Sequence, residues 1–167
     1  LAKRIKSFDV KLLGIELFAS EALKQECGFD WLDKSNLDYL LANSDIVVIC
    51  AAFTPQYKNM ISRAQFEKMK SSAFFINVAR GGFVDRDALD EALRTKKIAG
   101  AALDVFWEEP VNPADPVFNN NIIATPHIGA ATDTGYAGIA LRVGENIKRL
   151  QRGERILNCA NADKIYS

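Results

Sequence analysis

Arg80 stands in a sequence context that favours the binding of an acidic ligand. It lies in the run Asn77-Val78-Ala79-Arg80-Gly81-Gly82, directly after a stretch that predicts a buried strand. The two glycines would allow the backbone to turn and to approach a ligand closely. A guanidinium at this place can bind a carboxylate through two parallel hydrogen bonds. The alternative is a surface arginine that pairs with a neighbouring acid.

His127 is the only histidine of the chain and follows another predicted strand, in Thr125-Pro126-His127-Ile128-Gly129. Imidazole is the side chain best suited to exchange a proton near neutral pH. Glu109 could accept a hydrogen bond from the other ring nitrogen and so favour the imidazolium. Alternatives stay open for both residues. A lone histidine is often structural or merely exposed, and Glu109 could be a solvated loop carboxylate like its neighbour Glu108.

Two further acids also follow predicted strands. Glu16 comes after residues 11–15, where an acidic side chain can bind both hydroxyls of an adenosine ribose. Asp104 ends a predicted strand and could hold a polar amide of a ligand, although capping a helix or turn is an equally good interpretation. Neither acid decides the function by itself.

The elements that must position these residues alternate between strands and helices. Short apolar runs without polar alternation are typical of strands buried on both faces of a parallel sheet. Residues 1–8 have apolar residues at helical spacing and are expected to be the end of an amphipathic helix. A short apolar strand is expected to follow at residues 11–15. The buried runs are residues 46–50, 73–78, 100–105 and 122–124.

Helix start signals lie between these runs. Ser35 and Ser62, each with an acid or amide three residues later, predict capping boxes. Asp85 is the expected cap of the next helix, and a long final helix is expected from about Thr132 to Arg152, ended by Gly153. The apolar faces of these last two helices comprise Ala88, Leu89, Ala92 and Leu93, and Ile139, Val143, Ile147 and Leu150.

This alternation predicts an α/β fold with a doubly wound parallel sheet and right-handed crossovers. Ligands bind such sheets at the carboxyl ends of the strands. The unusual residue clusters of this chain all fall at those ends, at Glu16 and in residues 51–54, 79–82, 104–110 and 125–130.

The composition argues against several classes of function. The hydrophobic share of 49% is enough for a sizeable core, and the 21 basic and 21 acidic side chains cancel, so we expect no nucleic-acid or membrane partner. No apolar run approaches the roughly 20 residues of a membrane span, and no leader is recognisable, so we expect a cytoplasmic protein. Cys27, Cys50 and Cys159 are too scattered for a zinc site or a disulfide framework, so we expect reduced thiols and no metal.

Three motifs together resemble the D-isomer-specific 2-hydroxyacid dehydrogenases, a family that includes D-lactate, D-glycerate, phosphoglycerate and hydroxypyruvate or glyoxylate-reducing enzymes. The resemblance runs from Leu1 to about Asn161, and three motifs in the right order make it specific. The motifs are residues 77–82, residues 98–110 as Ile-Ala-Gly-Ala-Ala-Leu-Asp-Val-Phe-Trp-Glu-Glu-Pro, and residues 125–132 as Thr-Pro-His-Ile-Gly-Ala-Ala-Thr.

The resemblance implies a Rossmann-like NAD-binding domain with a catalytic trio. Arg80 is similar to the residue that binds the substrate carboxylate and polarises the 2-oxo group. His127 is similar to the proton donor and acceptor, and Glu109 to its partner. In reduction, charged His127 would supply the proton, while Arg80 would stabilise the charge that grows on the carbonyl oxygen.

The cofactor positions follow from the same resemblance. Glu16 is similar to the acid on the adenine ribose, and Asp104 to the acid that anchors the nicotinamide carboxamide. An acid at Glu16 favours NAD, because it would repel the 2′-phosphate of NADP. The resemblance also suggests a small 2-oxo or 2-hydroxy acid as substrate and a homodimer formed through the cofactor domain. The other cofactor-lining positions are Ala51, Ala52, Val78, Ala79 and Gly129.

The chain departs from the family pattern at its start. The glycine-rich turn G-x-G-x-x-G and the strand leading into it belong just before Leu1, so we expect a truncated dinucleotide-binding domain at residues 1–155. Residues 156–167 would be a tail leading toward an absent substrate domain. Loss of a central strand would leave a gap between the strands near Glu16 and the later ones. We expect such a fragment to be inactive by itself, and the particular 2-hydroxy acid stays open.

Two other functions occur among relatives of this family. Some relatives act as NAD-sensing regulators or corepressors that bind protein partners and keep the catalytic residues. Formate-oxidising members of the family carry Gln beside the histidine, and Glu109 argues against that branch.

Overall fold

The computed structural model describes residues 1–162, and the internal contacts divide the chain into two units. The first unit is Leu1–His127 and the second is Ile128–Ser167. Residues 163–167, the end of the expected tail at residues 156–167, lie outside the described part. Within the described part, no helix is long and apolar enough to cross a membrane.

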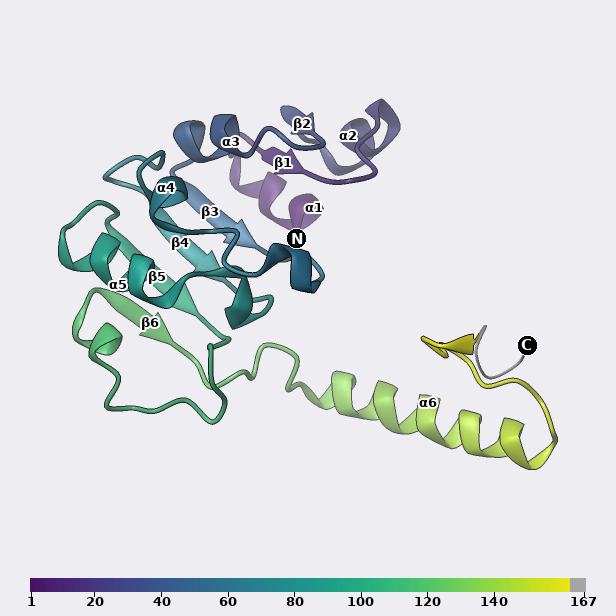
Figure 1. The fold of residues 1–167 in the computed structure, drawn as a ribbon. Helices are drawn as coiled ribbons and strands as arrows, with labels where there is room; N and C mark the ends of the chain where they lie inside the picture. Colours follow the sequence, from purple (N-terminus) through teal and green to yellow (C-terminus); the bar gives the residue numbers. More distant parts are fainter. Residues whose placement is uncertain (163–167) are drawn as a thin grey trace. The chain divides into compact units, whose positions relative to one another are not determined.

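The strands of the first unit form two parallel sheets with helices beside them, as the apolar runs predict (Figure 1). One sheet pairs β1 with β2, and the other has the order β3-β4-β5-β6. In the described residues no ladder joins the two sheets. The strands are β1 (Leu13–Ile15), β2 (Trp31–Asp33), β3 (Ile46–Ile49), β4 (Phe74–Asn77), β5 (Gly100–Leu103) and β6 (Ile122–Ala124).

The four strands of the larger sheet end level with one another. The ladder pairs Ile49 with Asn77, Asn77 with Leu103, and Leu103 with Ala124, and each of these is the last residue of its strand. The loops that follow the four strands therefore begin side by side at one edge of the sheet.

The helices agree with the sequence signals in most places. Residues 1–8 divide into α1 and a short 3-10 helix at Lys6–Phe8, in place of one amphipathic helix, and α2 and β2 were not predicted. The helices are α1 (Ala2–Ile5), α2 (Glu21–Cys27), α3 (Leu37–Asn43), α4 (Arg63–Phe66), α5 (Arg86–Arg94) and α6 (Asp133–Gln151).

The predicted helix caps are confirmed with one exception. Ser62 and Gln65 form the capping box of α4, and Asp85 caps α5 by accepting a hydrogen bond from the backbone N–H of Ala88. The prediction for Ser35 is wrong, because Asn36 caps α3 through the N–H of Tyr39. The backbone N–H groups of residues 35 and 36 are instead bound by the Asp33 carboxylate, which moves the start of the helix by one residue.

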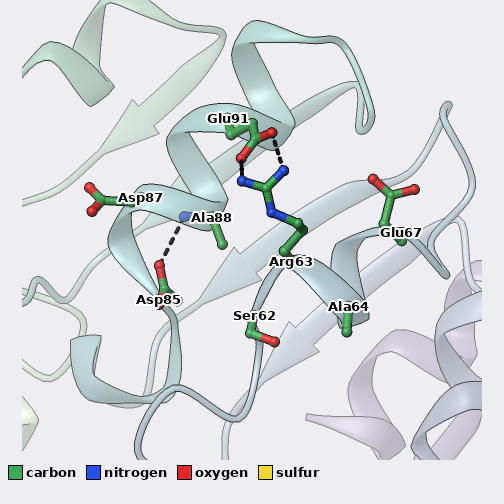
Figure 2. A pocket seen from close by; sticks show the side chains of 8 residues that line it. All are labelled: Ser62, Arg63, Ala64, Glu67, Asp85, Asp87, Ala88 and Glu91. Atoms are coloured by element: carbon green, nitrogen blue, oxygen red, sulfur yellow. Dashed lines mark hydrogen bonds and ion pairs between the residues drawn. The ribbon is translucent and has the colours of Figure 1, made fainter.

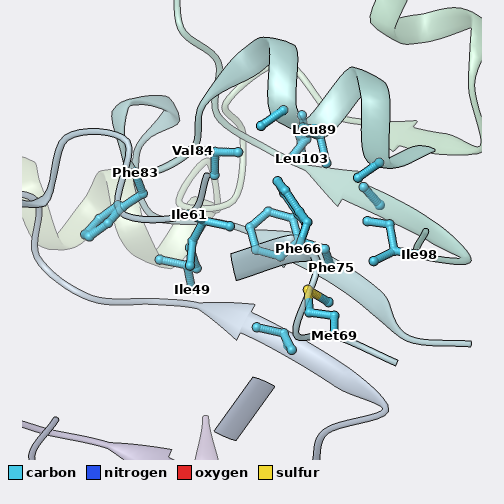
Figure 3. Close-up of a cluster of buried hydrophobic side chains, with 14 of the residues drawn as sticks. Ile49, Ile61, Phe66, Met69, Phe75, Phe83, Val84, Leu89, Ile98 and Leu103 are labelled. Carbon is cyan, nitrogen blue, oxygen red and sulfur yellow. The ribbon is translucent and has the colours of Figure 1, made fainter. Parts of the chain in front are cut away.

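The core lies between the four-stranded sheet and helices α4 and α5 (Figure 3). The rings of Phe66 and Phe75 meet edge to face with centroids 5.5 Å apart. The predicted apolar face of α5 is buried, because Ala88, Leu89, Ala92 and Leu93 all have less than 9% of their surface exposed. This packing holds the crossover helices against the sheet and leaves the loops at its edge accessible.

The second unit consists mainly of α6. Thr132 caps the helix and Gly153, with φ of 70°, follows its end, as predicted. No residue of α6 is buried. The predicted apolar stripe is therefore present in the sequence but uncovered in the structure, with Ile139, Val143, Ile147 and Leu150 each more than half exposed.

We predict that the Asp85 cap contributes measurably to stability. Asp85→Ala should lower the free energy of unfolding by about 1 kcal/mol, because the N–H of Ala88 loses its acceptor, whereas Asp85→Asn should cost less. Urea denaturation followed by circular dichroism measures the change. Asp87→Ala is the matched control, since this neighbouring carboxylate is 87% exposed and forms an ion pair with Arg86. Equal losses for Asp85→Ala and Asp87→Ala would contradict the assignment of the cap.

Candidate active site

An open pocket of about 850 Å³ lies at the carboxyl ends of β3 to β6. Parallel sheets bind ligands at this edge, and the volume is in the usual range for small-molecule sites, roughly 300–1,000 Å³. The loops after the strands supply its walls with residues 50–53, residues 78–82, Phe106, Trp107, Glu109 and His127. The three predicted catalytic residues, Arg80, Glu109 and His127, thus line one pocket.

His127 and Glu109 are joined by a hydrogen bond. Nδ1 of the imidazole lies 2.8 Å from Oε2 of the carboxylate, and the other carboxylate oxygen accepts the backbone N–H of Phe106 at 3.1 Å. The side chains are 41% and 37% exposed, so the pair is reachable from the pocket. Both oxygens of Glu109 are therefore engaged while the imidazole stays accessible.

The pKa of Glu109 is lowered from its ordinary value. The main cause is the hydrogen bond to His127, followed by the Phe106 N–H, and the positive charges of His127 and Arg80 add to it against the opposing effect of burial. An ionised carboxylate can only accept hydrogen bonds, so Nδ1 of His127 must carry the proton in this pair. The exchangeable position of the imidazole is then Nε2.

The backbone of His127 adopts a conformation that L-residues rarely take. Its φ is 55°, in the left-handed region, and its N–H donates to the carbonyl of Thr125 at 2.9 Å. Such a conformation costs roughly 1–2 kcal/mol, and residues held in this way concentrate at functional sites. The Thr125 hydroxyl donates to Asp104 at 2.5 Å, which ties this turn to the end of β5.

Arg80 lies in the turn after β4, with its backbone extended and its side chain at the pocket. Nη1 donates to the carbonyl of Ala79 at 2.6 Å. Its charge is near enough to Glu109 to contribute to the lowered pKa of that carboxyl. The guanidinium, the carboxylate and the imidazole are therefore electrostatically coupled.

The two glycines after Arg80 allow close contacts within the chain. A Cβ atom on Gly81 would lie 2.1 Å from the backbone carbonyl of Phe106, and one on Gly82 would lie 2.9 Å from the ring of Phe53. Both glycines accommodate close contacts within the chain, and both line the pocket. The contact at Gly81 joins the loop that carries Arg80 to the loop that carries Glu109.

The predicted cofactor positions divide into two groups. Four of them line the pocket: Ala51, Ala52, Val78 and Ala79. Glu16 follows β1 and is exposed, and its carboxylate accepts a hydrogen bond from the N–H of Phe18 at 3.3 Å. Asp104 is only 8% exposed and accepts a hydrogen bond from the Thr125 hydroxyl. Gly129 belongs to the second unit. Neither Glu16 nor Asp104 is part of the lining.

Sequence reasoning gave no role to two features of the site. Asn77 is 1% exposed, and its side-chain amide binds the backbone of both Ala79 and Arg80. Its signal in the sequence was a single polar residue at the end of an apolar run. Phe53, which packs edge to face on Phe83, forms part of the wall without any such signal.

A second hollow, of about 520 Å³, lies beside α4 and α5 (Figure 2). Its charged groups already have partners: Arg63 is paired with Glu91, Asp85 caps α5, and Glu67 lies 3.4 Å from Lys97. Within residues 1–162, moreover, no group of histidine, cysteine and acidic side chains could hold a metal ion.

Comparisons with known proteins identify the family. Residues 1–129 match the family model described as D-isomer specific 2-hydroxyacid dehydrogenase, NAD binding domain. D-3-phosphoglycerate dehydrogenase of Archaeoglobus fulgidus is 35% identical over 166 residues, which are 99% of this chain and 31% of that protein. Glyoxylate reductase of Thermococcus litoralis is 35% identical over 167 residues, covering 100% of this chain and 50% of that protein.

A solved structure shows the same fold. The crystal structure of D-lactate dehydrogenase with NAD+ from Lactobacillus jensenii has a TM-score of 0.80 and 28% identity, covering 93% of this chain and 49% of that one. The chain thus spans half or less of the length of these three proteins.

We predict that the pKa of Glu109 depends on His127. His127→Ala should raise this pKa toward the ordinary value of about 4.3, because it removes the hydrogen bond that lowers the pKa most. Arg80→Ala should raise it less, since that charge is the smallest of the contributions. A carbon-13 NMR titration of the Glu109 carboxyl measures both effects. A larger rise with Arg80→Ala than with His127→Ala would show that the carboxylate is held in another way.

Proposed function

Because the chain belongs to the D-isomer-specific 2-hydroxyacid dehydrogenase family and matches its NAD-binding domain, we propose that the whole protein interconverts a small D-2-hydroxy acid and its 2-oxo acid. The observation that carries the proposal is the hydrogen bond between Glu109 and His127 in the pocket that Arg80 also lines. Acid, base and carboxylate-binding groups are what this reaction needs from the protein.

The pocket suits the cofactor of the family. Ala51, Ala52, Val78 and Ala79 present small apolar side chains at the strand ends, which leaves room for a flat ring beside the polar groups. When bound there, NAD(H) would supply or accept the hydride. We propose that these four residues line the cofactor. Glu16 would bind the adenine ribose, and Asp104 and Gly129 would complete the nicotinamide end.

His127 would exchange the proton in this reaction. Ionised Glu109 keeps the proton of Nδ1 in place, so Nε2 is the atom that donates to the substrate oxygen during reduction and accepts from the hydroxyl during oxidation. The carboxylate also orients the imidazole, because Nδ1 of the ring lies 2.8 Å from Oε2 of Glu109. The second hydrogen bond, from Phe106 to Glu109, holds the carboxylate in this orientation.

Arg80 would bind the substrate acid. A guanidinium has five N–H donors, and among the described residues Nη1 of Arg80 donates to the carbonyl of Ala79. A bidentate pair with the substrate carboxylate would orient the 2-oxo group toward His127. The same positive charge would stabilise negative charge that develops on the carbonyl oxygen.

We also propose that the whole protein is a cytoplasmic homodimer. The dimer is what the resemblance to the family implies. The zero formal charge gives no general attraction to nucleic acids or anionic membranes. Sedimentation of the whole protein measures the number of copies, and a monomer at micromolar concentration would contradict the dimer.

We predict that His127→Ala in the whole protein lowers turnover far more than cofactor binding. The loss should be about 10²- to 10⁴-fold in kcat, which is the usual contribution of a positioned acid or base. The disappearance of NADH absorbance with a panel of 2-oxo acids measures turnover, and NADH fluorescence measures binding. Glu109→Gln should also lower kcat, whereas Glu108→Gln, at the exposed neighbouring position, is the matched control and should have little effect.

Three results would contradict the assignment. Equal losses of turnover and cofactor binding would give His127 a structural role. Equal effects of Glu108→Gln and Glu109→Gln would remove the specific role of Glu109. Tight NADH binding by the unmodified protein without turnover of any 2-oxo acid would favour an NAD-sensing regulator.

A further inference from the structure

We infer that Asn77 is a positioning residue that sets Arg80 for binding the substrate carboxylate. The inference rests on the proposed function, because it assigns a task to a residue that touches neither substrate nor cofactor. It is drawn from the contacts of the Asn77 amide and from its burial at the end of β4.

The amide group of Asn77 makes two hydrogen bonds to the turn that carries Arg80. Nδ2 donates to the backbone carbonyl of Arg80 at 2.9 Å, and Oδ1 accepts the backbone N–H of Ala79 at 3.1 Å. The Asn77 carbonyl accepts the N–H of Asp104 at 3.0 Å in the ladder between β4 and β5. The side chain therefore connects the turn directly to the rigid sheet.

The guanidinium is part of the same arrangement. Nη1 of Arg80 donates to the carbonyl of Ala79, whose own N–H is held by Asn77. On the other side, Gly81 contacts the backbone of Phe106 so closely that a Cβ atom has no room. Two sets of contacts thus fix the backbone around Arg80. One is the pair of hydrogen bonds from the Asn77 amide, and the other is the contact of Gly81 with Phe106.

The burial of Asn77 indicates that its polarity serves this turn. Asn77 is 1% exposed, and the preceding residues of β4 are Phe74, Phe75 and Ile76. A buried amide is costly unless its donor and acceptor are both satisfied. Asparagine offers one of each within reach of the backbone, whereas an ionised aspartate of the same size cannot donate. The position therefore requires an amide and not only a particular volume.

The test is a double-mutant cycle in the whole protein. The effect of Asn77→Ala on KM and kcat/KM is measured once in the unmodified protein and once in a protein that carries Arg80→Ala. In the otherwise unmodified protein, Asn77→Ala should raise KM for the 2-oxo acid and lower kcat/KM by about tenfold or more, because small misplacements of a binding group are costly. In the Arg80→Ala background the same change should cost less than about threefold, since residues that act together are not additive. Asn77→Asp, which keeps the volume and loses the donor, should behave like Asn77→Ala.

The control variant is Asn120→Ala, which also removes two hydrogen bonds of an amide, to Asp90 and to the carbonyl of Val117, but outside the pocket. It should lower thermal stability without changing KM. If Asn77→Ala does not fold, as judged by circular dichroism, Asn77→Asp and Asn77→Ser replace it in the same cycle.

The outcomes separate the inference from the proposed function. Losses of kcat/KM that are the same in both backgrounds, or an unchanged KM in the Asn77 variants, would overturn the positioning role while the dehydrogenase activity stands. An unmodified protein that turns over no 2-oxo acid would overturn the proposed function, and the inference with it.

Discussion

The level ending of four parallel strands is the constraint on which the site depends. Consecutive ladder pairs join the last residues of β3, β4, β5 and β6, so the loops that follow them start side by side. The buried core between the sheet and helices α4 and α5 keeps that register. Arg80, Glu109 and His127 come from three of these loops, and they line one pocket because the strands beneath them end together.

The loops also hold one another in place, which prepares the site before a ligand arrives. Gly81 allows the turn after β4 to lie against the backbone of Phe106 in the loop after β5, and the indole N–H of Trp107 donates to the carbonyl of Val84 at 2.6 Å. Glu109 is thereby held where it meets His127 and is kept ionised by the hydrogen bonds it accepts. Such prior organisation is the main way in which a protein lowers the cost of charge development in a reaction.

Much of the fold could be predicted because its signals are local. Apolar runs identified five of the six strands, and the caps at Ser62 and Asp85 followed from the residue types at helix starts. The cap at Ser35 was wrong because Asp33 binds the backbone N–H of Ser35, which the capping box assigned to Asp38, and Asn36 caps the helix instead. The strand at Trp31–Asp33 was missed because three residues of mixed polarity carry no periodic pattern.

The sequence by itself determined which chemical groups follow the strands: a guanidinium at Arg80, an imidazole at His127, and carboxylates at Glu108 and Glu109. Only the tertiary structure decided that the imidazole faces Glu109, that Gly81 meets the Phe106 backbone, and that the amide of Asn77 holds the turn of Arg80. The physical reason is how far apart along the chain the interacting residues lie. Strand and cap signals depend on neighbours a few residues away, whereas the contacts at Glu109 and Gly81 join segments that are distant in the chain, and the turn at Asn77 takes its shape from the packed sheet.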